Sequence, residues 1–301
     1  MTATEQPFSF PPSRVGPFVF EGRTFYVKRD DLIDPRYSGN KARKFHRLFS
    51  LPSDRYDTLV SYGGAQSNAM LSLAHLAKAK GWRFEYHCKR LPQWLRREPA
   101  GNLSAALALG MELNESEARD FYEVVQRRRQ RCGERELFVP QGGADPMAEE
   151  GVKRLADEVA AWFAGKGFAK GSVALPSGTG STAFYLCKHL PPSLRVATVP
   201  VVGDADTLRN QWRQLDPSAA AFPAILPSPK WPFAKPRADF LQLWRKLLEA
   251  GIEFDMIYAP KTWMALLRQA DALPAPILYI HTGGVSGNAS QLEQYRYRKM
   301  L

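Results

Sequence analysis

The stretch that decides the fold is Tyr37-Ser38-Gly39-Asn40-Lys41-Ala42-Arg43-Lys44-Phe45. It follows a strand-like run at residues 24–28 and leads into an apolar, helix-periodic segment. Lys41 therefore lies where a glycine turn becomes a helix, and the positive end of a helix disfavours a nearby ammonium group. Such a lysine, in a dry site above all, can act as a nucleophile and form a Schiff base with an aldehyde. The alternative is a surface lysine in a basic loop.

A second feature is the turn Pro176-Ser177-Gly178-Thr179-Gly180-Ser181-Thr182, which joins an apolar strand to a helix. Its small residues allow backbone N–H groups to approach a phosphate, and the following helix adds its positive end. The turn lacks the lysine of a P-loop and the spacing of a dinucleotide-binding fingerprint. The sequence therefore predicts a phosphate site of another kind, and the alternative is an ordinary small-residue turn.

Two further glycine-rich turns follow predicted strands. In residues 63–68, Ser67 and Asn68 lie at a helix start, where they could hold a carboxylate or simply cap the helix. The turn at residues 281–284, His-Thr-Gly-Gly, lies at the carboxyl end of a strand, where open α/β sheets bind ligands. His75 lies in mid-helix, and we expect a packed or surface histidine there rather than a catalytic one.

Strands and helices alternate along the chain, which favours parallel sheets with helices on their faces. Residues 1–18 suggest an extended arm and residues 222–237, rich in proline, a loop. We expect strands at residues 57–62, 83–88, 136–139, 172–175, 195–202 and 277–280. We expect helices at residues 66–80, 103–109, 115–132, 146–163, 183–190, 206–214 and 239–250.

Composition excludes several classes of protein. The 301 residues contain no apolar run long enough for a membrane span, and the N-terminus lacks a secretory signal. Three scattered cysteines form neither a disulfide framework nor a metal motif, which favours a reducing cytoplasm. The net charge of +11 is concentrated in part at residues 127–131, which suggests either a nucleic-acid patch or a solvated basic helix face. We expect the latter, because no nucleic-acid-binding motif accompanies the run.

Taken together, the motifs resemble one family in their order along the chain, the 1-aminocyclopropane-1-carboxylate deaminase/D-cysteine desulfhydrase family. These are pyridoxal-phosphate enzymes of the tryptophan synthase β-subunit fold type. The matching segments cover nearly the whole chain: residues 39–41, 64–68, 101–103, 109–110, 139–143, 178–182, 250–252, 258, 261 and 281–284. No motif is specific alone, and the ordered set carries the resemblance.

The resemblance implies a role for each matching residue. Lys41 would hold pyridoxal 5'-phosphate covalently, and Asn68 would bond the ring hydroxyl. Ser67, with Gln66 and Asn68, would meet the substrate carboxylate, and Ser67 could also act as an acid–base group. Tyr258 would flank the cofactor or substrate and take part in catalysis. The cofactor's remaining contacts would be Gly178, Thr179, Gly180, Ser181, Thr182 and Thr282.

The sequence also departs from the family. Ala259 and Pro260 follow Tyr258, where the family has Glu or Thr and then Gly, so the carboxylate that faces the pyridine nitrogen in the deaminase is missing. Ala69 and Met70 follow Asn68 in place of His or Gln and Thr, and Ser181 replaces a usual glycine. These departures bear on the substrate more than on the cofactor.

The resemblance implies two doubly wound α/β domains, the smaller inserted in the larger, with the cofactor in the cleft between them. The larger domain would comprise residues 1–50 and 165–301, and the smaller residues 51–164. We expect a homodimer that eliminates or deaminates a small amino acid such as D-cysteine to a 2-oxo acid and ammonia. The alternatives are 1-aminocyclopropane-1-carboxylate deaminase activity, a cofactor-binding homologue without turnover, and a basic nucleic-acid-binding module.

Overall fold

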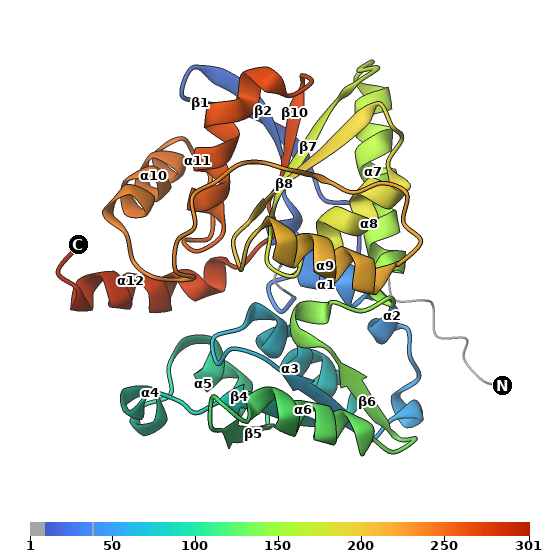
Figure 1. Cartoon of the computed structure of the whole chain (residues 1–301), viewed down its shortest axis with the longest axis vertical. Helices are drawn as coiled ribbons and strands as arrows, with labels where there is room; N and C mark the ends of the chain where they lie inside the picture. The colour runs from blue at the N-terminus through green and yellow to red at the C-terminus, as the bar shows by residue number, and fades with distance from the viewer. Residues whose placement is uncertain (1–9, 38) are drawn as a thin grey trace.

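The computed structural model describes residues 10–37 and 39–301. The chain forms two sheets, a six-stranded one in the upper part of Figure 1 and a four-stranded one in the lower part. Strands and helices alternate through both parts, and every pairing except that of the first two strands is parallel. The predicted two-domain α/β fold class is therefore confirmed.

The larger sheet has the strand order β1-β2-β10-β7-β8-β9. Its strands are β1 (Val15–Phe20), β2 (Arg23–Lys28), β7 (Gly171–Ser177), β8 (Leu194–Pro200), β9 (Ala224–Ile225) and β10 (Ile277–Ile280). Side chains of β7 and β10 alternate between two apolar cores on opposite faces of this sheet. Burial on both faces explains why these strands are continuous apolar runs in the sequence.

Helices cover both faces of the larger sheet (Figure 1). On one face lie α7 (Ala148–Gly165), α8 (Ser181–His189) and α9 (Ala205–Leu215). On the other lie α10 (Ala238–Glu249) and α11 (Ala259–Gln269). The C-terminal helix α12 (Asn288–Tyr297) packs through Tyr295 onto a small cluster with α10.

The smaller sheet has the order β5-β4-β3-β6. Its strands are β3 (Thr58–Tyr62), β4 (Arg83–Lys89), β5 (Met111–Ser116) and β6 (Glu136–Val139). Helices α3 (Asn68–Lys80) and α5 (Gly101–Ala108) share its main core, and α6 (Phe121–Gln130) packs against β4. The remaining α-helices are short: α1 (Asn40–Lys44), α2 (His46–Phe49) and α4 (Gln93–Arg97).

Several predicted elements differ from the structure. Residues 115–132 are not one helix, because strand β5 runs to Ser116 and α6 begins only at Phe121. All five residues of β5 after Met111 are exposed or partly exposed, so this edge strand has no apolar run by which the sequence could indicate it. The sequence also failed to indicate α11, α12 and the short strand β9 in the predicted loop at residues 222–237. Of the predicted arm, residues 1–9 lie outside the described part of the chain, and residues 15–18 belong to edge strand β1.

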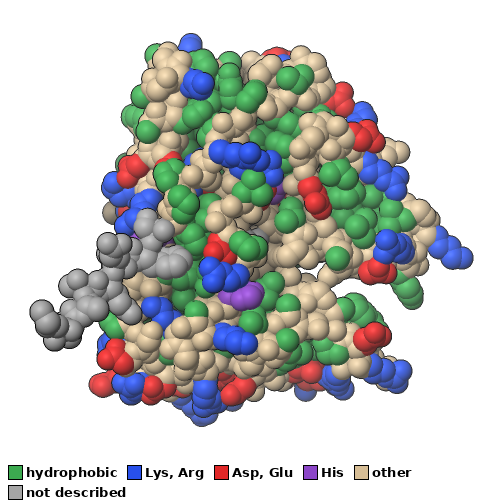
Figure 2. Space-filling model, turned by 180° about the vertical axis from the view of Figure 1, so that it is seen from behind, with side chains coloured by type: hydrophobic (Ala, Val, Ile, Leu, Met, Phe, Trp, Pro, Cys, Tyr) green, Lys and Arg blue, Asp and Glu red, His purple; other side chains and the backbone are tan. Residues whose placement is uncertain are grey.

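Helix α7 packs in the core of the larger sheet, although residues 51–164 were assigned to the smaller domain. Conversely, Phe45, Leu48 and Phe49 lie in the core of the smaller sheet. We therefore propose that the boundary between the domains lies ahead of α7. Among the described residues, no helix is long and apolar enough to cross a membrane. On the face shown in Figure 2, basic and acidic side chains are interspersed.

Candidate active site

Lys41 is the second residue of α1, immediately after the turn at Gly39. Gly39 has a φ of 46°, and a Cβ there would lie 2.2 Å from the backbone of Thr282, so only glycine fits. The Lys41 Nζ donates a hydrogen bond to Asn40 Oδ1 at 2.7 Å. Burial lowers the pKa of Lys41 to about 8, and the nearby Asp255 opposes this shift. Burial, more than the helix end invoked from the sequence, makes this lysine a candidate nucleophile at neutral pH.

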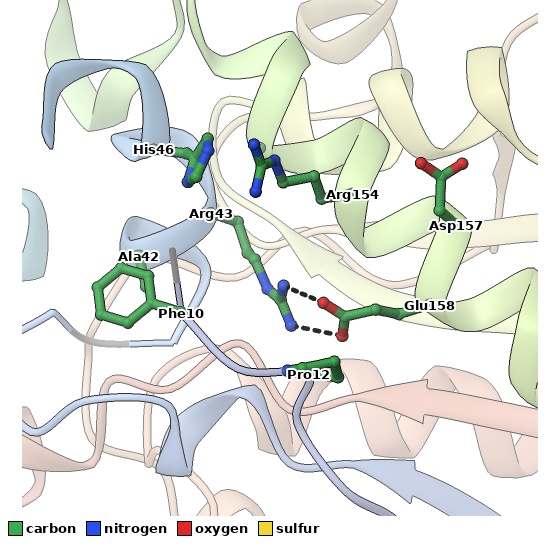
Figure 3. A pocket seen from close by; sticks show the side chains of 9 residues that line it. Phe10, Pro12, Ala42, Arg43, His46, Arg154, Asp157 and Glu158 are labelled. Carbon is green, nitrogen blue, oxygen red and sulfur yellow. Dashed lines mark hydrogen bonds and ion pairs between the residues drawn. The ribbon is translucent and has the colours of Figure 1, made fainter. Parts of the chain in front are cut away.

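A buried ion-pair network fixes the helix that carries Lys41. The Arg43 guanidinium bonds Asp30 and Glu158, and Glu158 also accepts from Lys28 at 2.6 Å. Figure 3 shows Arg43 of α1 directed at Glu158 of α7. A cavity of about 250 Å³ lies beside this network, and no predicted site residue lines it. The network therefore anchors α1 against the larger domain from the side away from the site.

The turn at residues 178–182 connects β7 to α8, as predicted. No side chain caps α8, so the N–H groups of its first turn are available to a ligand. Gly180 has a φ of 72°, and a Cβ there would lie 2.6 Å from Trp212, which donates to the Gly180 carbonyl at 3.0 Å. Thr182 receives a long hydrogen bond from Asn40 Nδ2 at 3.4 Å, which brings this turn beside the Lys41 turn.

Lys44 of α1 contacts the turn at residues 178–182, and the sequence motifs did not indicate it as a candidate site residue. Its Nζ donates to Gly142 O at 2.9 Å and to Thr179 Oγ1 at 3.3 Å. Burial lowers the pKa of Lys44 well below its usual value, and the neighbouring charge of Lys41 lowers it further. Within residues 10–37 and 39–301 neither lysine forms an ion pair with a carboxylate. The signal in the sequence was its position three residues after Lys41, on the same helical turn.

Ser67 is the N-cap of α3, so the capping interpretation is confirmed. Its Oγ accepts from the N–H groups of Ala69 at 3.2 Å and Met70 at 3.4 Å. Tyr86 lies beside it and donates to Gly64 O at 3.1 Å. Burial raises the pKa of Tyr86 above its usual range, while the hydrogen bond with Ser67 opposes that rise. Since the serine oxygen is the acceptor for two amides, its hydroxyl hydrogen remains for Tyr86 or a ligand.

Gln66 and Asn68 flank Ser67 and join the start of α5. Gln66 donates to Ala100 O at 2.9 Å and accepts from Asn102 N at 3.0 Å. Asn68 Oδ1 accepts from Asn102 Nδ2 at 2.9 Å and, from the larger domain, from Ser286 Oγ at 3.4 Å. The turn at residues 64–68 is thus held by α5 and contacts the segment after the His-Thr-Gly-Gly turn.

Tyr258 immediately precedes α11 and lies against the turn at residues 178–182. A Cβ on Gly178 would lie 3.4 Å from the Tyr258 hydroxyl oxygen. Burial, with the charge of Asp255, raises the pKa of Tyr258 above its usual range. Asp255 Oδ1 accepts from the backbone N–H groups of Ile257 and Tyr258, and burial raises the pKa of this carboxyl group. Asp255 was missed as a site residue because nothing in its local sequence shows that it lies near Lys41.

The His-Thr-Gly-Gly turn at residues 281–284 touches both domains. Thr282 O accepts from Asn40 N at 3.0 Å, and a Cβ on Gly284 would lie 3.0 Å from Asn68 Nδ2. His281 Nδ1 accepts from Gly283 N, which fixes the shape of the turn. His75, by contrast, is half-buried in α3, and its pKa is lowered mainly by burial. The structure therefore brings Lys41, Asn68 and Thr282 toward one place from three elements. Within the part of the chain that the structure describes, His75 has no hydrogen bond to any of these three residues.

No family model matches the chain. It is 26% identical over 290 residues to a putative 1-aminocyclopropane-1-carboxylate deaminase of Pyrococcus furiosus, covering 88% of this chain and 86% of that protein. It is 28% identical over 292 residues to D-cysteine desulfhydrase of Yersinia pestis strain Pestoides F, covering 87% of each. Among solved structures, an ACC deaminase homologue matches with a TM-score of 0.77 at 23% identity over 94% of each chain. The processed form of threonine deaminase isoform 2 from Solanum lycopersicum matches with a TM-score of 0.61 at 12% identity, covering 92% of this chain and 82% of that one.

These solved structures share the two-sheet α/β fold of the chain. Over most of its length the chain is similar in sequence to proteins named putative 1-aminocyclopropane-1-carboxylate deaminase and D-cysteine desulfhydrase. The resemblance predicted from the motifs is confirmed.

Proposed function

We propose that the protein is a pyridoxal-phosphate-dependent enzyme that acts on a small amino acid and yields a 2-oxo acid and ammonia. The observation that carries this proposal is the pair of buried amines, Lys41 and Lys44, beside the uncapped start of α8. Burial lowers the pKa of both amines, and neither forms an ion pair with a carboxylate of the described residues, so the pair suits a doubly charged anion such as a phosphate. An aldehyde on the same ligand would meet Lys41, whose pKa of about 8 leaves part of it neutral.

The residues present fit pyridoxal phosphate. The ammonium of Lys44, the hydroxyls of Thr179, Ser181 and Thr182, and the first N–H groups of α8 would hold the phosphate. Asn68 would donate to the ring hydroxyl. Thr282 O accepts from Asn40 N, so Thr282 lies beside the residue that precedes Lys41, where it would contact the ring. When bound, the cofactor would supply an electron sink for charge that develops at the substrate Cα.

The chain's own groups would bind the substrate and move protons. Lys41 would accept the Cα proton, since its lowered pKa makes the neutral amine available near pH 8. Tyr258 stays protonated because its pKa is raised, so it can donate a hydrogen bond to a leaving group. Gln66 and Ser67 would bind the substrate carboxylate at the start of α3, where the helix dipole favours an anion.

Among substrates, D-cysteine suits the site better than 1-aminocyclopropane-1-carboxylate. Ala259, fully buried as the first residue of α11, has no side-chain group to hold a proton on the pyridine nitrogen. D-Cysteine has a Cα proton and a β-sulfur leaving group, so its reaction depends less on a protonated pyridine nitrogen. Its net reaction consumes one water and gives pyruvate, hydrogen sulfide and ammonia, which balances without an oxidant.

The test is turnover by the purified protein reconstituted with pyridoxal phosphate. We expect 2-oxo acid and sulfide from D-cysteine, and no turnover by Lys41→Ala. Lys78→Ala, which removes an exposed lysine of α3, is the matched control and should retain wild-type activity. Cofactor binding without turnover of any small amino acid would refute the catalytic proposal and favour a binding homologue. Sedimentation of the same preparation tests the predicted homodimer.

A further inference from the structure

We infer that Asn102 is a positioning residue that fixes which end of the Asn68 amide faces the ligand. This inference rests on the proposed function, because it concerns the donor that Asn68 would present to the cofactor's ring oxygen. Asn102 lies in the first turn of α5, and its side chain is buried, with 2% of the residue exposed. No role for Asn102 followed from the sequence motifs alone.

The direction of the hydrogen bonds determines the orientation of both amides. Asn102 Nδ2 lies 3.1 Å from Gln66 O, and a backbone carbonyl can only accept, so the atom of Asn102 that faces it must be nitrogen. The same nitrogen lies 2.9 Å from the Asn68 side chain, so the facing atom of Asn68 must be its oxygen. Ser286 Oγ of the larger domain lies 3.4 Å from the same oxygen and can donate to it.

The consequence is that Asn68 Nδ2 points away from Asn102, toward the His-Thr-Gly-Gly turn. It lies 3.0 Å from where a Cβ on Gly284 would be, and no described residue accepts its hydrogen atoms. Asn68 therefore presents a donor, and the group it receives must be an acceptor such as a deprotonated ring oxygen. An asparagine free to turn would present either end.

The backbone around Asn102 is shaped for this contact. The Asn102 N–H donates to Gln66 Oε1 at 3.0 Å, which places its side chain beside the turn at residues 64–68. Gly101 has a φ of 59°, and a Cβ there would approach Ser290 Oγ to 2.2 Å and Gln66 Oε1 to 2.8 Å. Only glycine allows α5 to come this close to both α12 and Gln66.

The test is Asn102→Asp, which keeps the shape and removes both donors. The Asn68 amide should then turn to donate to the new carboxylate and present its oxygen to the ring oxygen. We expect at least tenfold weaker binding of pyridoxal phosphate and a shift of the bound cofactor's absorption to shorter wavelength, as the ring oxygen takes up a proton. Asn114→Asp, the same change at an exposed position of β5, is the matched control and should leave both quantities unchanged.

A double-mutant cycle separates positioning from general damage. In an Asn68→Ala background, Asn102→Asp should cause no further spectral shift, because the group it acts through is gone. An equal shift in both backgrounds, or a wild-type spectrum for Asn102→Asp, would overturn the inference while the proposed function stands. If Asn102→Asp does not fold, Asn102→Ala is compared in both backgrounds by cofactor affinity: weaker binding only when Asn68 is present supports the inference, and wild-type affinity overturns it. A wild-type protein that binds no pyridoxal phosphate would refute the proposed function itself, and the inference with it.

Discussion

Replacement of Lys44 should change cofactor affinity and the stability of the cofactor-free protein in opposite directions. Lys44→Met keeps an unbranched side chain and removes the ammonium group beside Thr179 and Gly142. A hydrogen bond to a charged group is worth about 1.5–3 kcal/mol. Since about 1.4 kcal/mol corresponds to a factor of ten, pyridoxal phosphate should bind roughly 10- to 150-fold more weakly.

The cofactor-free protein should not lose stability from the same change. The folded-state pKa of Lys44 lies well below its usual value of 10.5, so the unfolded chain binds more protons between those two values. The free energy of unfolding therefore rises with pH in that window, and Lys41 adds a rise between about 8 and 10.5. Lys44→Met should remove its share of this rise and leave the protein at neutral pH at least as stable as the wild type.

Two measurements check this prediction: absorbance titration of the cofactor-free protein with pyridoxal phosphate, and chemical unfolding at a series of pH values. Lys78→Met removes the same charge from an exposed site and should change neither result. Wild-type cofactor affinity in Lys44→Met would show that Lys44 does not contact the phosphate. A large loss of stability at neutral pH would show that its contacts to Gly142 and Thr179 are structural.

Three other predictions follow from the site and the surface. Thr182→Val should weaken cofactor binding by about 1–3 kcal/mol, since a hydroxyl donor to a charged phosphate is lost, and unchanged affinity in a titration would count against the turn at residues 178–182. With Ala259 in place of a carboxylate, kcat/KM for D-cysteine should exceed that for 1-aminocyclopropane-1-carboxylate in a 2-oxo acid assay, and the reverse order would defeat the argument. Nucleic-acid binding through residues 127–131 should be weak and strongly salt-dependent, because Arg128 is already paired with Glu85 and Glu136. Tight, sequence-selective binding at physiological salt in a filter or anisotropy assay would contradict this prediction.

The turns of the site could be predicted from the sequence because glycine marks them. Gly39 and Gly180 have left-handed φ values and neighbours that would collide with a Cβ, so the local sequence carries the constraint. The strands β7 and β8 were likewise expected from the sequence, and the alternation of strands with helices indicated that the sheets are parallel. These signals indicated parallel α/β sheets, whereas the division into two domains was implied by the resemblance to the family.

The residues whose roles the sequence did not indicate make contacts with residues that are distant from them in the sequence. Lys44 meets Gly142 and Thr179, and Asp255 lies near Lys41, although more than ninety residues separate each pair. Asn102 matters because of its hydrogen bonds to Gln66 and Asn68. Such roles depend on tertiary packing, which local propensity and periodicity do not encode.

The most direct test of the central claim is to identify the residue that carries the cofactor. The protein reconstituted with pyridoxal phosphate should be yellow and should lose its colour on reduction with borohydride. Mass spectrometry of the digested protein should then find a single pyridoxyl group on Lys41. A pyridoxyl group on Lys44, Lys261 or any other lysine, at normal cofactor occupancy, would contradict the account.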